Sequence, residues 1–129
     1  DDILMGMNDD DSIMGLAGDD WITGGRGDDM IEGNAGFDSL RGGGGDDRIS
    51  GGRSNDFVFG DNGNDVLHGD DGLTAAKGSD LSSDYLNGGK GNDILYQSDG
   101  NDTLAGGEGR DSFFFKWSDP MVALAAGTG

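Results

Sequence analysis

The chain contains no cysteine and one histidine, so it forms no disulfide and offers no thiolate ligand to a metal. Basic residues are scarce: eight Lys and Arg stand against 26 Asp and Glu, for a net charge of −18, which argues against a nucleic-acid partner. No stretch approaches the roughly 18 consecutive apolar residues of a membrane-spanning helix, so we expect no transmembrane segment. No signal peptide opens the 129 residues, and we expect any targeting segment to lie elsewhere in a longer polypeptide.

Glutamate is almost absent as well, because only Glu32 and Glu108 appear among the 26 acidic residues. A chain that is merely acidic and solvated would mix both carboxylates, so the shorter aspartate indicates a tight geometric demand near a turn. The shortage also excludes an EF-hand, whose loop ends in a bidentate glutamate. No nucleophile–base pair and no pair of catalytic carboxylates stands apart from the aspartate pattern, so we expect no enzymatic activity.

What is abundant is a nine-residue period. The phrase G-x-x-G-x-D-x-φ-x, where φ is aliphatic or aromatic, occurs eleven times, and a fixed period of this kind decides a fold. The repeats begin at Gly6, Gly15, Gly24, Gly33, Gly42, Gly51, Gly60, Gly69, Gly88, Gln97 and Gly106. Position six is always aspartate: Asp11, Asp20, Asp29, Asp38, Asp47, Asp56, Asp65, Asp84, Asp93, Asp102 and Asp111. Position eight is always apolar: Ile13, Ile22, Ile31, Leu40, Ile49, Val58, Leu67, Leu86, Leu95, Leu104 and Phe113.

The repeat predicts an all-β solenoid. Its last three positions favour a short strand and its first six a turn, with glycine at positions one and four supplying backbone freedom. Neighbouring side chains of a strand face opposite ways, so position eight points to the core and positions seven and nine point outward. Because strands this short must stack, we expect two repeats to form one coil of 18 residues and two parallel sheets to face each other.

Folding of such a chain requires a cation. Only position eight of each nine-residue repeat is expected to be buried in the core, and this surface is too small to offset the entropy of ordering the chain. The stacked carboxylates also repel one another. The available ligands are carboxylate and carbonyl oxygens, which favour Ca²⁺ over Zn²⁺ and over the strictly octahedral Mg²⁺. We therefore expect Ca²⁺ to bind between the turns and to be needed for folding.

Two of the clearest repeats, Gly24–Glu32 and Gly88–Tyr96, resemble the RTX, or haemolysin-type, calcium-binding repeat, and the likeness covers residues 1–114. The resemblance implies a right-handed parallel β-roll within a secreted bacterial protein exported by type I secretion, such as a toxin, protease, lipase, epimerase or adhesin. It also implies a ligand set. Each ion takes the carbonyls of positions two and four and the position-six aspartate of one turn, and the carbonyls of positions one and three and the aspartate of the turn above.

Carried onto this chain, the resemblance implies up to about nine Ca²⁺ ions, with interior aspartates such as Asp47 shared between two of them. Besides the position-six aspartates, the implied ligands are Gly18, Gly24, Gly25, Gly27, Gly33, Gly36, Gly42, Gly43, Gly44, Gly45, Gly60, Asn62, Gly63, Gly88, Gly89, Lys90, Gly91, Gly106 and Glu108.

The two edges of the predicted roll differ. We call the edge with the turns of the repeats that start at residues 24, 42, 60, 88 and 106 the regular edge, and the other the irregular edge. The irregular edge departs from the pattern at position one with Gln97, at position two with Leu16, Asn34, Asp70 and Ser98, and at position four with Ser54. A carbonyl ligand survives a side-chain change only if the backbone angles do, so we expect strain at Ser54 and gaps in occupancy on this edge.

Three features leave alternatives open. Ten extra residues at 73–82 form either a tolerated insertion or a recognition loop with a further cation site. Residues 115–129 predict the start of a truncated C-terminal cap or tail. Outward aromatics cluster at Phe57, Phe59 and Tyr85, either through cross-strand packing or as a docking patch.

The sequence therefore predicts a calcium-binding β-roll that folds outside the cell, with the rest of its parent polypeptide and a glycan or surface ligand as partners. The alternative is a carbohydrate-binding module like those attached to alginate epimerases, with Arg41 beside the outward aromatics of one sheet.

Overall fold

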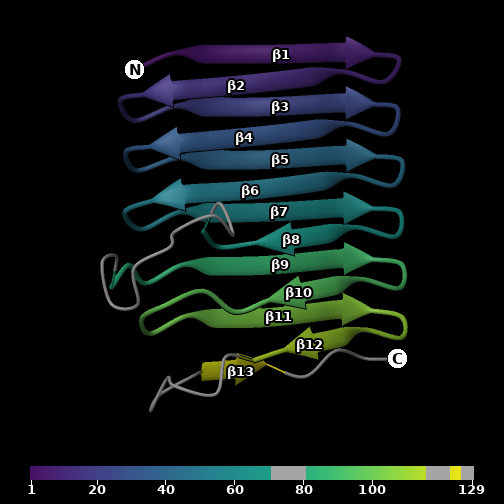
Figure 1. The fold of residues 1–129 in the computed structure, drawn as a ribbon. Coiled ribbons are helices and arrows are strands. Elements are labelled where there is room, and N and C mark those ends of the chain that lie inside the picture. The colour runs from purple at the N-terminus through teal and green to yellow at the C-terminus, as the bar shows by residue number, and fades with distance from the viewer. Residues whose placement is uncertain (71–80, 116–122, 126–129) are drawn as a thin grey trace.

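The computed structural model describes residues 1–70, 81–115 and 123–125. These residues form an all-β solenoid without any helix, as predicted, in which successive strands alternate between two parallel sheets (Figure 1). The seven-stranded sheet has the order β1-β3-β5-β7-β9-β11-β13, and the six-stranded sheet the order β12-β10-β8-β6-β4-β2. None of the described residues belongs to a helix with the length and hydrophobicity needed to cross a membrane.

The strands of each sheet lie one coil apart. The first sheet contains β1 (Ile3–Asn8), β3 (Trp21–Arg26), β5 (Ser39–Gly44), β7 (Phe57–Asn62), β9 (Tyr85–Lys90), β11 (Thr103–Glu108) and β13 (Ala123–Ala125). The second contains β2 (Ser12–Ala17), β4 (Met30–Ala35), β6 (Arg48–Arg53), β8 (Val66–His68), β10 (Ile94–Tyr96) and β12 (Ser112–Phe114). Ile22 pairs with Leu40, so one coil takes 18 residues, and the register is kept across the insertion where Val58 pairs with Leu86.

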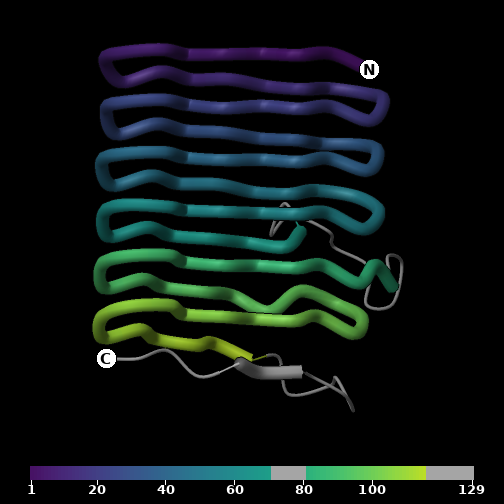
Figure 2. The backbone as a smooth tube through the Cα atoms, turned by 180° about the vertical axis from the view of Figure 1, so that it is seen from behind, coloured from purple at the N-terminus to yellow at the C-terminus, as the bar shows by residue number. Residues whose placement is uncertain are grey.

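Most strands are longer than predicted. β3, for example, runs over six residues and includes positions one to three of the repeat that begins at Gly24. These positions still pair with the neighbouring coil, as Gly25 does with Gly43, so the parallel ladder continues through them. The turn is therefore confined to positions four to six, and Figure 2 shows these turns stacked along both edges of the roll.

The core is a column of position-eight side chains between the two sheets. Nine of them are at most 1% exposed: Ile22, Ile31, Leu40, Ile49, Val58, Leu67, Leu86, Leu95 and Leu104. Leu4, Ile13 and Phe113 pack against this column while remaining partly exposed. Positions seven and nine face outward as predicted; Trp21, at position seven, is 62% exposed.

Glycine serves two different purposes in the repeat. Positions two and four have a positive φ, as at Gly25 (119°) and Gly27 (123°), and Ser54 is held at 78°, which agrees with the predicted strain. The prediction for position one was wrong, because its glycines do not have a positive φ. They are required for space instead: a Cβ on Gly24 would overlap Oδ2 of Asp29 in the same repeat.

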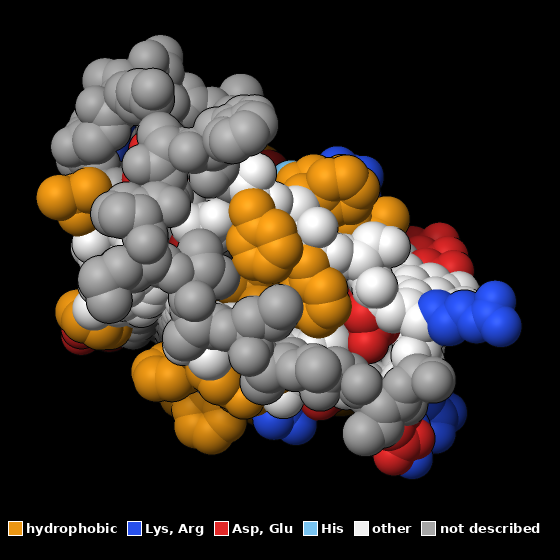
Figure 3. Space-filling model, turned by 90° about the horizontal axis from the view of Figure 1, so that it is seen from below, with side chains coloured by type: hydrophobic (Ala, Val, Ile, Leu, Met, Phe, Trp, Pro, Cys, Tyr) orange, Lys and Arg blue, Asp and Glu red, His pale blue; other side chains and the backbone are white. Residues whose placement is uncertain are grey.

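Most of the predicted 73–82 loop and of the predicted cap at 115–129 lies outside the described residues. At the end of the roll seen in Figure 3, hydrophobic side chains gather on the described surface. Phe114 and Phe115 of this region are each 50% exposed.

Candidate functional site

The position-six aspartates form two buried rows, one along each edge of the roll. Those from Asp20 to Asp102 are at most 3% exposed, and only Asp11 and Asp111 at the ends are partly exposed. In each row, Oδ1 of one aspartate accepts a hydrogen bond from the backbone N–H of the aspartate one coil earlier. Oδ1 of Asp47 accepts from Asp29, and Oδ1 of Asp65 from Asp47, both at 2.8 Å. These bonds hold successive turns in register.

The second carboxylate oxygen, Oδ2, is buried in most turns without a hydrogen-bond donor among the described residues. This holds for Asp11, Asp20, Asp29, Asp38, Asp47, Asp65, Asp93 and Asp111. A buried carboxylate oxygen without a partner is strongly unfavourable unless a positive charge lies beside it. A repeated row of such oxygens fits a row of cations.

Carbonyl oxygens converge on the same gaps between turns. A Cβ placed on Gly42 would contact both Oδ2 of Asp47 and the carbonyl oxygen of Gly60, so these two oxygens lie close together. A Cβ on Gly43 would overlap the Gly25 carbonyl oxygen, and one on Gly45 the Gly27 carbonyl oxygen. The carbonyls of positions two and four thus face the next coil, and that of position one faces back toward the previous coil.

The position-three carbonyls have a further partner. Those of Gly44, Asn62, Lys90 and Glu108 accept hydrogen bonds of 2.8–3.0 Å from the position-four N–H of the coil before. A carbonyl oxygen has two lone pairs, so each retains one for a cation. Within residues 1–70, 81–115 and 123–125, no three His, Asp or Glu side chains come close enough to hold one ion, so carbonyls must complete any site.

The predicted glycine ligands occupy equivalent places on both edges. Gly18, Gly36, Gly63 and Gly91 at position four, and Gly89 at position two, have the positive φ of this turn. Gly33, Gly88 and Gly106 at position one abut Oδ2 of their own aspartates, as Gly24 does. The sequence reasoning omitted further members with the same positive φ, which the nonapeptide register identifies: Gly52, Gly100, Gly107 and Gly109.

Burial raises the pKa of six of the position-six aspartates, and neighbouring carboxylates add to this effect while the backbone hydrogen bond to Oδ1 partly opposes it; these are Asp29, Asp38, Asp47, Asp65, Asp84 and Asp93. The pKa of Asp47 rises to about 6 and that of Asp65 to about 7. Desolvation also raises the pKa of Asp84 to about 6. The ionised rows are thus unfavourable on their own, which a divalent cation in each gap would reverse.

Position five carries a second ladder that the sequence reasoning missed. Oδ1 of Asp10 accepts from the backbone N–H of Asp28, and Oδ1 of Asp28 from that of Asp46, both at 2.8 Å. Asn64 continues the ladder by accepting from Asn92 at 2.9 Å. The signal was present in the sequence, because position five of these repeats is Asp or Asn, the side chains that bond locally to backbone amides.

Two position-six aspartates on the irregular edge differ from the rest. Oδ2 of Asp84 and Oδ2 of Asp102 each lie 2.8 Å from Oγ of Ser98. The Ser98 backbone N–H also donates to Oδ2 of Asp102, at 2.9 Å. In this gap, the hydroxyl and N–H of Ser98 contact the carboxylate oxygens that have no hydrogen-bond donor in most other turns.

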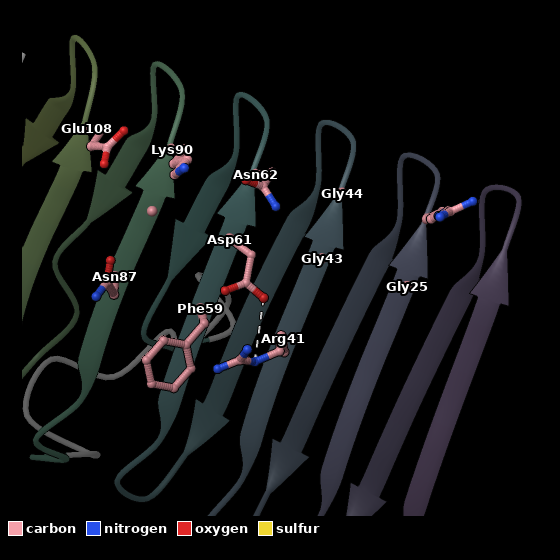
Figure 4. Close-up of a pocket in the computed structure, with 12 residues that line it drawn as sticks. Gly25, Arg41, Gly43, Gly44, Phe59, Asp61, Asn62, Asn87, Lys90 and Glu108 are labelled. Atoms are coloured by element: carbon pink, nitrogen blue, oxygen red, sulfur yellow. Dashed lines mark ion pairs between the residues drawn. The ribbon is translucent and has the colours of Figure 1, made fainter.

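The outer face of the seven-stranded sheet has a groove of about 820 Å³ (Figure 4). Arg41 lies across it, with Nε 3.5 Å from Oδ2 of Asp61 and the guanidinium carbon 5.2 Å from the ring centre of Phe59. Phe59 in turn packs against Tyr85 at 5.8 Å between ring centres, as the predicted aromatic cluster required. Asn87 and Lys90 also line the groove, which therefore combines an aromatic face with charged and amide groups.

The six-stranded sheet carries a column of stacked rings on its outer face. The rings of His68 and Tyr96 lie 4.4 Å apart and nearly parallel, and those of Tyr96 and Phe114 lie 4.8 Å apart. Burial lowers the pKa of His68, and the nearby Arg48 charge lowers it further. His68 is thus part of an aromatic column on a strand, in line with its predicted position there.

Comparison with known protein families gives a match along most of the chain. The model described as the RTX calcium-binding nonapeptide repeat (4 copies) matches residues 1–31, 23–58, 41–73 and 78–113. A search of curated proteins and of solved structures found no match. The matched segments span most of the chain and coincide with the stacked turns and their buried aspartates. The chain therefore belongs to the RTX family of calcium-binding nonapeptide repeats.

Proposed function

We propose that this chain is a non-enzymatic module of a larger secreted bacterial protein, and that Ca²⁺ binding drives its folding outside the cell. The observation that carries the proposal is the rows of buried Oδ2 atoms that have no donor among the described residues, most of which lie beside a carbonyl oxygen of the next coil. Hard oxygen ligands of this kind, with several carbonyls, suit Ca²⁺.

The ligands of one site follow from the gap between two coils of the regular edge. The first coil contributes the carboxylate of Asp29 and the carbonyls of Gly25 and Gly27. The next contributes the carboxylate of Asp47 and the carbonyls of Gly42 and Gly44. The same pattern repeated along both edges assigns the predicted ligands, and it makes Asp47 a ligand of two neighbouring ions. Each ion supplies the charge that the buried carboxylates lack.

Coupling between metal and fold follows from the thin core. A single column of aliphatic side chains has to stabilise the ordered part of the chain, and the aspartate rows oppose folding by charge repulsion. Where ligands come together only in the folded state, the free energy of metal binding becomes free energy of folding. Extracellular calcium modules bind at about 10⁻⁴–10⁻³ M, so the chain would remain unfolded during export and fold on arrival.

Far-UV circular dichroism tests this proposal. The protein in EGTA is expected to give the spectrum of an unordered chain, and millimolar Ca²⁺ to give a β-sheet spectrum. Millimolar Mg²⁺ and NaCl at equal ionic strength serve as controls and are expected to leave the chain unfolded. A sheet spectrum that persists in EGTA, or one that Mg²⁺ restores equally well, would contradict the proposal.

The groove on the seven-stranded sheet favours a second function, the binding of a glycan. Sugar rings stack on aromatic faces, and Phe59, which is half-buried, lines the groove beside Arg41, Asn87 and Lys90 and packs against Tyr85. Titration with neutral and anionic oligosaccharides in Ca²⁺, followed by NMR, tests this function.

Loss of binding is expected in Phe59→Ala, which removes a ring from the groove. Trp21→Ala, which removes an exposed ring of the same sheet that does not line the groove, is the matched control and is expected to bind normally. Equal loss in both variants, or no binding by the unaltered chain, would rule out the groove as a glycan site.

A further inference from the structure

We infer that Ser98 takes the place of a calcium ion in one gap of the irregular edge, so that the coils carrying Asp84 and Asp102 are joined by hydrogen bonds instead of metal. This inference rests on the proposed function, because it concerns which of the gaps between turns hold an ion. It separates the gaps expected to hold an ion from the one gap in which Ser98 bonds to both carboxylates.

The two carboxylates of this gap are satisfied by one residue. Ser98 is 1% exposed and has two donors, its hydroxyl and its backbone N–H. The hydroxyl lies 2.8 Å from Oδ2 of Asp84, and the N–H lies 2.9 Å from Oδ2 of Asp102. The Ser82 hydroxyl adds a longer contact of 3.3 Å to Oδ2 of Asp84. Two donors thus meet the two oxygens that would otherwise face a cation.

The carbonyl ligands of this gap are displaced as well. Beside Gly51 and Gly60, the nearest atoms include the position-one carbonyl oxygen of the next coil, which belongs to Gly69 and Gly88 respectively. Beside Gly69 the corresponding neighbour is Oγ of Ser98. The hydroxyl therefore stands where a carbonyl oxygen stands in the ordinary gaps.

The repeat departs from the ordinary pattern at Gln97. Position one is otherwise glycine, because a Cβ there overlaps Oδ2 of the aspartate in the same repeat, as it would at Gly88 with Asp93. Gln97 has a Cβ and cannot follow that path. Strand β10 ends at Tyr96, as β8 ends at His68 in the coil before, Ser98 lacks the positive φ usual at position two, and the chain bends before β11 (Figures 1 and 2). The bend brings the Ser98 side chain between the two carboxylates.

Anomalous diffraction from crystals of the unaltered protein grown in Ca²⁺ tests the inference. Calcium peaks are expected in ordinary gaps, such as that between Asp29 and Asp47, and none is expected between Asp84 and Asp102, where Ser98 is expected to keep both contacts. A calcium ion between Asp84 and Asp102 would overturn the inference while leaving the proposed function intact. Absence of calcium from every gap would overturn the proposed function, and the inference with it.

A paired substitution tests the same point in solution. Gln97→Gly with Ser98→Gly restores the ordinary repeat and is expected to bind one more Ca²⁺ than the unaltered chain, counted by native mass spectrometry at saturating Ca²⁺. Asn34→Gly, a position-two change in an ordinary turn of the same edge, is the control and is expected to leave the count unchanged. An equal count in the double variant with an unaltered sheet spectrum would overturn the inference; if that variant does not fold, the diffraction result decides.

Discussion

Replacing Asp47 by asparagine isolates the cation-facing oxygen of one aspartate in the middle of the regular edge. Asp47 is 1% exposed, and its Oδ1 accepts from the Asp29 N–H at 2.8 Å, a bond that an asparagine carbonyl oxygen retains. The substitution changes Oδ2, which has no donor among the described residues, into an amide nitrogen and removes one negative charge. Under the proposed ligand assignment, two neighbouring calcium ions would each lose a charged ligand.

The size of the effect follows from these contacts. An interaction with a charged group contributes about 1.5–3 kcal/mol, so the loss at two ions amounts to about 3–6 kcal/mol. Because folding takes up several ions together, the change in the calcium midpoint is shared among them. If about eight ions bind cooperatively, the midpoint is expected to rise about two- to fourfold.

Asp46→Asn is the matched control, since it removes the same charge from the adjacent residue. Asp46 is exposed, and its Oδ1 accepts from the Asn64 N–H at 2.8 Å. Asn64 performs the same role in the next coil with an amide oxygen, so asparagine is expected to fit at residue 46. A surface charge contributes about 0–1 kcal/mol, so the midpoint is expected to change by less than about 1.3-fold. Calcium titrations followed by circular dichroism measure both midpoints, and equal shifts in the two variants would refute the assignment of Asp47 as a shared ligand.

Two further predictions follow from the same turns. Gly42→Ala is expected to cost about 1–3 kcal/mol or more and to raise the calcium midpoint, because its Cβ would overlap Oδ2 of Asp47. Gly44→Ala, on the same strand with open space around its Cβ, is the control, and equal destabilisation of the two variants would contradict the packing argument. The raised pKa values of Asp47 (about 6) and Asp65 (about 7) mean that the folded chain without Ca²⁺ holds more protons than the unfolded chain above about pH 4, so its stability falls as the pH rises through 6 to 7. Calcium requires the ionised forms, and the unfolded chain is already ionised above about pH 5, so the calcium midpoint for folding is expected to change little between about pH 5.5 and 7.5 and to rise as the pH falls below about 4.5, measurable by circular dichroism. A midpoint that falls steeply between about pH 6 and 7 would show instead that Ca²⁺ binds a folded, protonated chain.

The period alone was enough to predict the architecture. An apolar residue at position eight and an aspartate at position six of every nine-residue repeat are compatible with one stacking of short strands, and the column from Ile22 to Leu104 lies where that stacking puts it. The sequence also predicted that side chains at positions seven and nine face outward, because side chains alternate along a strand. The length of the strands was not predicted, because positions one to three join the sheet by pairing with other coils, and a local sequence pattern does not reveal that pairing.

The site divides in the same way. The sequence by itself determined which carboxylates line the gaps, because an aspartate that recurs in phase with the core must fall on the same edge in alternate repeats. Only the tertiary structure decided how each gap is filled. The space that requires glycine at position one, the ladder from Asp10 through Asp28, and the contact of Ser98 with Asp84 all join residues of different turns or different sides of one turn. These contacts depend on where the backbone passes, so they follow from the packed coils and not from the repeat.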